Sequence, residues 1–222
     1  MMESLRFRGR TEAGRYLAER LSGYAGRDDV IVLALPRGGV PVGYEVAKAL
    51  GVPLDVFVVR KVGVPGREEL AMGAIASGGL LVLDQGVVRA LGVSREQIER
   101  AVEAELRELQ RREAAYRDGR GPPQLEGKTV ILVDDGLATG STMRAAALAV
   151  RQANPARIVV AVPVAAAETC DEFRDVVDDI VCGVTPRPFR AVGLWYDDFS
   201  QTTDEEVREL LAQAADRAAS SV

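Results

Sequence analysis

The sequence of 222 residues contains no histidine. This absence excludes Ser-His-Asp and Cys-His nucleophilic catalysis, and it removes the commonest side-chain ligand of transition metals. Only two cysteines occur, Cys170 and Cys182, and they lack CxxC spacing. We therefore expect neither a disulfide framework nor a zinc site, and we predict two buried thiols. Acid–base chemistry must rely on carboxylates, lysine, tyrosine or the backbone.

Long hydrophobic runs are also absent, because the longest have the length of a strand and a membrane helix needs roughly 20 apolar residues. The first residues, MMESLRFRGR, lack the apolar core of an export signal. We therefore expect a cytoplasmic protein without a membrane partner. The net charge of −5 argues against a nucleic-acid partner, although a local basic cleft could hold a small anion.

Apolar runs alternate with helical patterns along the chain, which is typical of βαβ units around a mostly parallel sheet flanked by helices. The length favours one domain over two equal ones. We predict a single domain over residues 1–222 with a core at about 28–165. Strands are predicted at 30–35, 54–59, 129–134, 157–164 and 179–182, and helices at 11–24, 41–50, 141–152, 166–173 and 203–218.

An insertion at about residues 70–118 separates the second and third core strands. It is predicted to contain a hairpin at 70–83 and a long helix at about 95–117, where Ser94 and Gln97 have capping-box spacing. A narrow apolar stripe runs along this helix among Glu and Arg side chains. The stripe favours an arm that packs on its own domain over a contact between subunits, and a homodimer is the alternative.

The segment Val130 to Thr142 (VILVDDGLATGST) carries the strongest functional signal. An apolar strand ends in Asp134 and Asp135, and a short loop with Gly136 and Gly140 leads into a helix. Ligands of open α/β sheets bind at this end of the strands, and amides at a helix N-terminus favour a phosphate. Adjacent carboxylates cannot both be buried cheaply, but a polyhydroxyl ligand or a magnesium-bound water would satisfy them. Neither a Walker loop nor GxGxxG is present, so the ligand is not a nucleoside triphosphate.

This segment resembles the phosphoribosyl-pyrophosphate signature of type I phosphoribosyltransferases, in which a hydrophobic strand and two acidic residues precede a TG(S/G/K)T loop. Over roughly residues 10–200 the chain is similar to a broad group of predicted phosphoribosyltransferases. The resemblance implies that the acidic residues hold ribose hydroxyls and, through these or through water, a magnesium ion, while the loop holds the 5-phosphate. The donor-binding residues implied in this way are Asp134, Asp135, Gly136, Ala138, Thr139, Gly140, Ser141 and Thr142.

The implied reaction moves a phosphoribosyl group from 5-phosphoribosyl 1-pyrophosphate to a nitrogen acceptor of the nucleobase class and releases pyrophosphate, as in nucleotide salvage. Ala138 stands where purine-salvage members often carry an acidic residue and uracil-type members can have a small one, so the base is not fixed. A regulator that senses the donor without catalysis is the alternative on the same fold. A hydrolase that uses the Asp pair is disfavoured, because no GxSxG elbow is present.

Residues 34–43 (ALPRGGVPVG) place Arg37, Gly38 and Gly39 between a strand and a helix that Pro41 opens. Paired glycines allow a nest of amides, and arginine suits bidentate contact with a phosphate. The loop resembles the pyrophosphate loop of the family, which often holds an unusual peptide geometry. The alternative is an ordinary turn with a solvated arginine.

Arg60 and Lys61 end the next predicted strand and precede a loop that contains Gly63, Pro65 and Gly66. Two cations are costly to bury without partners, so they are expected to face an anion or water. The region resembles the mobile catalytic loop of the family. This resemblance implies that Arg60 and Lys61 stabilise the leaving pyrophosphate.

The C-terminal part, about residues 184–222, resembles the small hood that sets base specificity in phosphoribosyltransferases. It contains the only tryptophan, Trp195, followed by Tyr196, and aromatic faces can stack on a heterocyclic base. The alternative is that Trp195 and Phe199 anchor the C-terminal helix, which Thr203 and Glu206 are predicted to open as a capping box.

Overall fold

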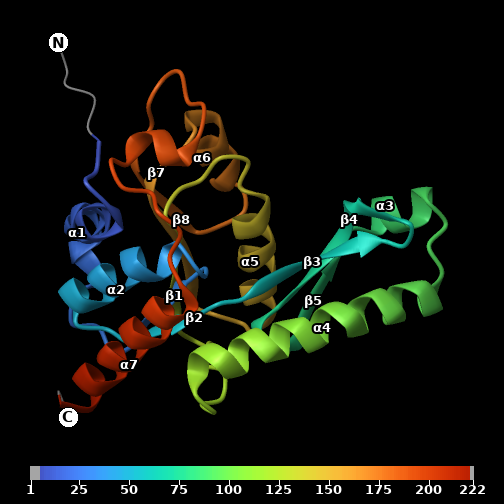
Figure 1. The fold of residues 1–222 in the computed structure, drawn as a ribbon, viewed down its shortest axis with the longest axis horizontal. Helices are drawn as coiled ribbons and strands as arrows, with labels where there is room; N and C mark the ends of the chain where they lie inside the picture. The colour runs from blue at the N-terminus through green and yellow to red at the C-terminus, as the bar shows by residue number, and fades with distance from the viewer. Residues whose placement is uncertain (1–5, 221–222) are drawn as a thin grey trace.

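The computed structural model describes residues 6–220 (Figure 1). Its centre is a five-stranded parallel sheet with the strand order β2-β1-β6-β7-β8. These strands are β1 (Val30–Ala34), β2 (Leu54–Val56), β6 (Thr129–Val133), β7 (Arg157–Val164) and β8 (Asp179–Val184). Three of them, β1, β6 and β7, are almost entirely buried, which explains their unbroken apolar sequences.

Helices cover both faces of this sheet (Figure 1). On one face α1 (Arg10–Arg20) and α2 (Gly39–Leu50) pack against every second residue of the central strands. On the other face α5 (Ser141–Gln152) and α6 (Ala167–Phe173) pack against the alternate residues. The prediction of a mostly parallel sheet flanked by helices is therefore confirmed.

The strand order reverses between β1 and β6. The chain proceeds from β1 to β2 on one side, and from β6 through β7 to β8 on the other. Ala34 at the end of β1 is in register with Val133 at the end of β6, so both strands end at the same edge. The loops that follow them consequently lie side by side at a topological switch point, which is where open α/β sheets bind ligands.

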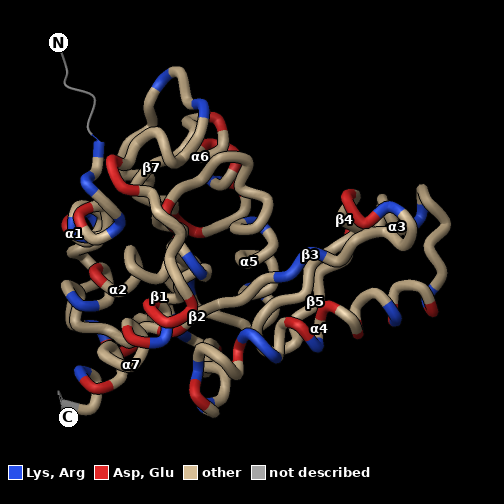
Figure 2. Tube along the Cα trace, in the orientation of Figure 1, with Lys and Arg blue, Asp and Glu red and all other residues tan. Residues whose placement is uncertain are grey.

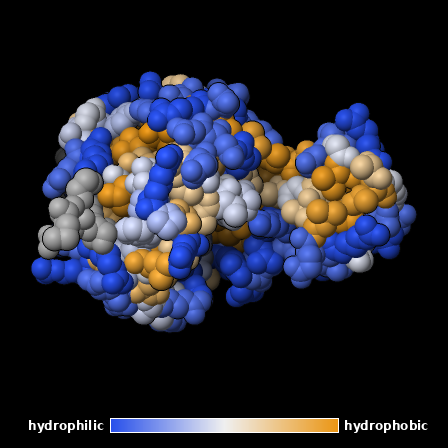
Figure 3. Space-filling model, turned by 90° about the horizontal axis from the view of Figure 1, so that it is seen from above, coloured by the Kyte–Doolittle hydropathy of each residue, from blue (hydrophilic) through white to orange (hydrophobic). Residues whose placement is uncertain are grey.

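A three-stranded antiparallel sheet and two helices project from the body as an arm (Figures 1 and 3). Its elements are β3 (Val59–Val64), β4 (Arg67–Ala76), β5 (Leu80–Leu83), α3 (Gln85–Ala90) and α4 (Arg95–Arg117). The apolar stripe of α4 packs on β3 and β4, and Leu109 is fully buried there. The end of α4 meets α7 (Asp204–Ser220), so the arm packs on its own chain.

The arm differs in detail from the sequence prediction. The strand predicted at 54–59 is divided, because the chain leaves the parallel sheet after Phe57, whose amide donates to the Ala34 carbonyl at 2.9 Å. The segment with Arg60 and Lys61 is then a strand of a hairpin that pairs with β4, and it is not a free loop. The predicted hairpin at 70–83 is only the second half of the three-stranded sheet, and α3 was not predicted.

The surface of the arm carries both charged and hydrophobic side chains. Positive and negative side chains alternate along α4 (Figure 2), where Arg95 pairs with Glu99 and Arg107 with Glu103 one turn apart. Hydrophobic residues are exposed on one side of the arm (Figure 3), and Leu70 is 43% exposed. Among residues 6–220, no helix has the length and apolar character that crossing a membrane requires.

Candidate functional site

The loop after β6 encloses a cavity of about 170 Å³ at the start of α5. The first amides of a helix have no acceptor within the helix. Those of residues 139–142 donate to no other group of the described chain, and the side chains of Thr139, Ser141 and Thr142 are exposed. This is the geometry of an anion site at a helix N-terminus. The cavity is lined by Asp134, Gly136, Leu137, Ala138, Thr139, Gly140, Ser141, Thr142, Met143 and Val192.

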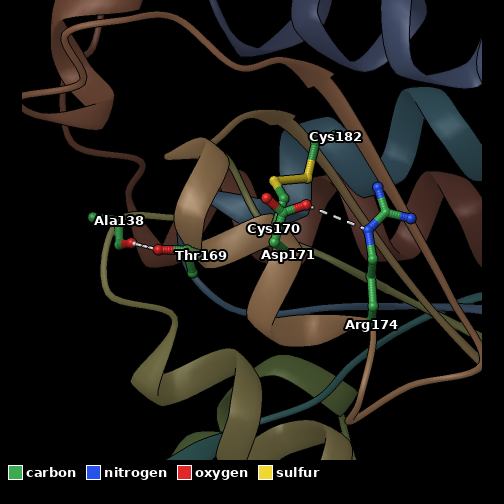
Figure 4. Close-up of a disulfide and its surroundings, with 6 residues drawn as sticks. All are labelled: Ala138, Thr169, Cys170, Asp171, Arg174 and Cys182. Carbon is green, nitrogen blue, oxygen red and sulfur yellow. Dashed lines mark hydrogen bonds and ion pairs between the residues drawn. A yellow bond between two sulfur atoms is a disulfide. The ribbon is translucent and has the colours of Figure 1, made fainter.

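The helix α6 packs against the loop after β6, residues 134–140, which we call the phosphate loop after its predicted role. Gly140 has a left-handed φ of 70°, and a Cβ atom there would lie 2.6 Å from the Phe173 ring, so only glycine fits. The Thr169 hydroxyl donates to the Ala138 carbonyl at 2.6 Å (Figure 4). Both contacts hold the loop in the conformation that leaves its amides free.

The prediction of two buried thiols is wrong, because Cys170 of α6 and Cys182 of β8 form a disulfide (Figure 4). The chain turns back after α6 and brings the two Cα atoms to 6.8 Å, a distance that allows the bond. The disulfide therefore fastens α6 to the sheet, next to the Thr169 contact with the phosphate loop.

Breaking this disulfide should lower the free energy of unfolding by about 3 kcal/mol, because it removes a cross-link across a sequence separation of 12. The measurement is urea denaturation with and without a dithiol reductant. The double variant Cys170→Ser/Cys182→Ser is the control and should be insensitive to the reductant. A wild type that is equally insensitive would show that the bond does not stabilise the protein.

The acidic pair lies at the mouth of the same loop, and a residue from α1 holds one of its members. The Asp135 amide donates to Oδ1 of Asp134 at 2.8 Å. Nε and Nη2 of Arg10 both lie 2.9 Å from Oδ2 of Asp135. The Arg10 side chain is only 11% exposed; it also donates to the Ser200 carbonyl at 2.7 Å and stacks over the Phe199 ring. Arg10 thus links α1, the acidic pair and the hood.

The surroundings disfavour negative charge on the pair. Burial raises the pKa of Asp134 well above its ordinary value, and the nearby charge of Asp135 raises it further. Burial also raises the pKa of Asp135, while the Arg10 guanidinium opposes that change. Asp134 forms no ion pair with any residue in 6–220, so only the more distant charge of Arg10 opposes the rise of its pKa, and it lines the cavity. A ligand with hydroxyl groups or a cation would stabilise its charged form.

Replacement of Asp134 with Asn should stabilise the ligand-free protein near neutral pH, because burial disfavours the charged carboxylate and a neutral amide does not carry that cost. The pKa of such a carboxyl is higher in the folded protein than in the unfolded chain. Its protonated form therefore favours folding below the pKa of the unfolded chain, and this contribution to the free energy of unfolding is lost as the pH rises through the pKa in the folded protein. The advantage of the variant should therefore shrink as the pH falls toward about 4. Urea denaturation across this range measures it, and a variant less stable than wild type at neutral pH would contradict the account.

The loop after β1 brings two of the predicted pyrophosphate-binding residues, Gly38 and Gly39, to the acidic pair, but not the side chain of the third, Arg37. A cis peptide bond joins Pro36 and Arg37, which is the kind of unusual geometry that the resemblance implies. Gly38 lies directly against the Asp135 carboxylate, and Gly39 lies against the backbone at the end of β6. The Arg37 side chain extends away from the phosphate cavity, and its Nη1 lies 3.7 Å from Oδ1 of Asp204 in α7.

Arg60 and Lys61 are not brought to the phosphate cavity in this conformation. The Arg60 guanidinium donates to Glu105 of α4 at 2.7 Å. Lys61 is exposed and lines a cavity of about 530 Å³ between the hairpin and α4. Their predicted role at the pyrophosphate would require the hairpin to close toward the body.

The two aromatic residues of the hood have different environments. Tyr196 is 2% exposed, packs between Phe7 and Phe199, and donates its hydroxyl to the Asp135 carbonyl at 2.6 Å. It offers no ring face to a base, so its predicted base-binding role gives way to an anchoring one. Trp195 is half-buried, and its indole Nε1 is enclosed without an acceptor in the described part of the chain.

The fold and the site define a class of open α/β protein with a candidate anion site at the topological switch point of its sheet. Residues 8–185 match the model of the phosphoribosyl transferase domain, and the chain belongs to that family. A Mycobacterium tuberculosis relative, whose name as a phosphoribosyl transferase is provisional, is 45% identical over 94% of this chain and 47% of its own length. The chain therefore spans about half the length of this curated relative.

A solved structure of similar sequence is that of TT1426 from Thermus thermophilus. It is 44% identical, and the match covers 94% of this chain and 98% of that one with a TM-score of 0.83. This likeness extends across the arm and the hood as well as the central sheet. The name of that protein specifies no acceptor, so the substrate has to be argued from the site.

Proposed function

We propose that the protein transfers a 5-phosphoribosyl group from 5-phosphoribosyl 1-pyrophosphate to a ring nitrogen of a nucleobase and releases pyrophosphate. The observation that carries this proposal is the juxtaposition at the switch point. The acidic pair and the loop at residues 136–142 follow β6 directly, and at one edge of the sheet they meet the glycine-rich loop after β1, which is distant in the sequence. Together they match the three charged or polar parts of the donor, its 5-phosphate, ribose hydroxyls and pyrophosphate.

In the proposed complex the amides and hydroxyls of residues 139–142 bind the 5-phosphate, because these residues line the cavity and their amides have no acceptor among residues 6–220. Asp134 accepts hydrogen bonds from the ribose hydroxyls, which would compensate the cost of its burial. Asp135 is already held by Arg10, so its main contribution is to fix the geometry of the ribose site. The backbone of Gly38 and Gly39 cradles the pyrophosphate.

The residues present fit a magnesium ion that is held mainly by the donor. Within residues 6–220 no cluster of three or more His, Cys, Asp or Glu residues is arranged to hold a metal. Magnesium typically keeps several waters and uses only one or two carboxylates with substrate phosphates, which Asp134 and Asp135 can provide through water or the ribose hydroxyls. When bound, the ion would neutralise charge on the leaving pyrophosphate.

Catalysis in this proposal consists of positioning and charge stabilisation. The bond from ribose C1 to the pyrophosphate oxygen breaks as the acceptor nitrogen approaches, and positive charge develops on the sugar ring. The ion pair of Arg10 and Asp135 holds the ribose site rigid. Arg60 and Lys61 would stabilise the departing pyrophosphate after closure of the hairpin, which would also exclude water.

A screen for pyrophosphate release tests the proposal. The wild type is incubated with donor, magnesium and each common nucleobase, and the Asp134→Asn/Asp135→Asn variant serves as the control. Release that depends on one base and is lost in the variant supports the enzyme. Donor binding without release with any base would instead identify a sensor on the same fold, and release of phosphate from simple esters would point to a hydrolase.

A further inference from the structure

A second polar pocket lies where the end of α4 meets the start of α7. Its volume is about 160 Å³, and it is lined by Arg37, Arg111, Arg112, Ala115, Tyr116 and Asp204. Three guanidinium groups therefore converge from two segments that are far apart in the sequence. A water molecule occupies about 30 Å³ in the liquid, so the pocket has room for an anion of several heavy atoms.

Positive charge is in excess around this pocket. Arg111 and Arg112 share a single carboxylate, that of Glu108, which accepts hydrogen bonds from both at 2.8–2.9 Å. These two arginines hold the pKa of Glu108 down at about 2, so it is already charged and fully engaged. Asp204 is the other carboxylate and faces Arg37 at 3.7 Å. Three cations thus face two anions.

The donors available to an anion in this pocket are guanidinium N–H groups, because the Tyr116 hydroxyl proton is already used. The Tyr116 hydroxyl donates to Oδ1 of Asp204 at 2.6 Å. Burial is the larger cause and this hydrogen bond the smaller one that together raise the pKa of Tyr116 to about 12. The hydroxyl therefore stays protonated at neutral pH. Side chains of Arg37 and Arg112 are 35% and 41% exposed, so their remaining N–H groups can reach an incoming oxyanion. Planar guanidinium groups suit bidentate contact with phosphoryl oxygens.

The pocket adjoins the candidate donor site through Arg37. The backbone of this residue belongs to the glycine-rich loop after β1, and its guanidinium lines the second pocket. We infer that Arg37, Arg111 and Arg112 form a subsite for a phosphoryl oxyanion. The phosphoryl group can come from the pyrophosphate end of the donor or from a separate phosphorylated ligand. Only the first of these sources rests on the proposed function.

Calorimetric titration of inorganic pyrophosphate tests this subsite. The variant Arg111→Gln/Arg112→Gln removes two of the three pocket cations. The matched control Arg95→Gln/Arg107→Gln removes the same charge from the same helix at side chains that are 93% and 71% exposed and outside the pocket. We expect pyrophosphate to bind the pocket variant at least tenfold more weakly than wild type, while the control stays within twofold.

A parallel titration of 5-phosphoribosyl 1-pyrophosphate distinguishes the two sources. Weaker binding of both compounds to the pocket variant assigns the subsite to the donor, and weaker binding of pyrophosphate alone assigns it to another phosphorylated ligand. Equal pyrophosphate affinities of the pocket and control variants, or no binding to wild type, would overturn the inference. Failure of the proposed function is a separate result, in which wild type binds pyrophosphate but not the donor.

Discussion

Replacing Arg10 with Met should lower the free energy of unfolding by about 3 kcal/mol near neutral pH, because it leaves the buried Asp135 carboxylate without its cation. Both side chains are largely buried, at 11% and 15% exposed. The change also removes the hydrogen bond to the Ser200 carbonyl and the stacking on Phe199. The hood should therefore loosen together with the acidic pair.

The loss caused by Arg10→Met should depend on pH in a defined direction. Burial already raises the pKa of Asp135, and Arg10 opposes that rise, so removing Arg10 raises the pKa further. The variant should therefore take up a proton on Asp135 at a higher pH than wild type, and its deficit in the free energy of unfolding should shrink as the pH falls through the raised pKa. Urea denaturation at several pH values measures this.

Arg8→Met is the control for this experiment, because the Arg8 side chain is 90% exposed and its ion pair with Glu12 is long, at 4.0 Å. It should change stability by less than about 0.5 kcal/mol. The second variant Arg10→Met/Asp135→Asn should recover part of the loss, since the carboxylate that Arg10 neutralises is also removed. A deficit that is independent of pH and unaffected by Asp135→Asn would contradict the proposed pairing.

Gly39→Ala should disrupt the site itself. A Cβ atom at this position would lie 2.8 Å from the Val133 carbonyl oxygen and 3.0 Å from the Cα of Asp134. Both contacts are with backbone that cannot rotate away, so the loop after β1 must move from the end of β6. We expect a loss of about 2 kcal/mol in stability and donor binding weakened by more than about tenfold, since misplacement by about 1 Å can cost two orders of magnitude.

Thermal denaturation and donor titration of Gly39→Ala check this result. Gly23→Ala is the matched control, because a Cβ atom there meets nothing within 4 Å. The control should bind the donor like wild type. Unchanged donor affinity in Gly39→Ala would show that the close approach of the two loops is not needed for binding.

The sequence predicted those elements whose signals are local. The helix at Arg95–Arg117 has the predicted bounds because Ser94 and Gln97 form the expected capping box. The strand at Arg157–Val164 and the helix at Ser141–Gln152 also match, since apolar periodicity and turn residues limit each one. The loop at residues 136–142 could be predicted as a phosphate site because all the groups on which that prediction depends lie within one continuous segment.

Features that depend on distant pairs could not be predicted in this way. Arg10 is separated from Asp135 by 125 positions, and nothing in its neighbourhood distinguishes it from other surface arginines. The bond between Cys170 and Cys182 depends on how α6 returns to β8, which spacing alone does not reveal. The place of Arg60 within a hairpin depends on its pairing with Ile75, which leaves no periodic trace in the sequence.

The sequence did not predict the second polar pocket, lined by Arg37, Arg111 and Arg112, for the same reason. Arg111 and Arg112 belong to an alternating charge pattern along α4 (Figure 2) that indicates a solvated helix face, and Arg95 and Arg107 of this pattern are indeed exposed. Only the packing of α4 against α7 places these two residues beside Arg37. Identical local sequence patterns therefore have different roles according to what the tertiary structure brings opposite them.

The most direct test of the account is calorimetric titration of 5-phosphoribosyl 1-pyrophosphate with magnesium into wild type and into Asp134→Asn/Asp135→Asn. We predict one donor bound per chain in wild type. We expect affinity to fall by about a hundredfold or more in the variant, because each lost hydrogen bond to a charged group contributes about 1.5–3 kcal/mol. Absence of donor binding to wild type, or equal binding to the variant, would contradict the assignment of this edge of the sheet as a phosphoribosyl site.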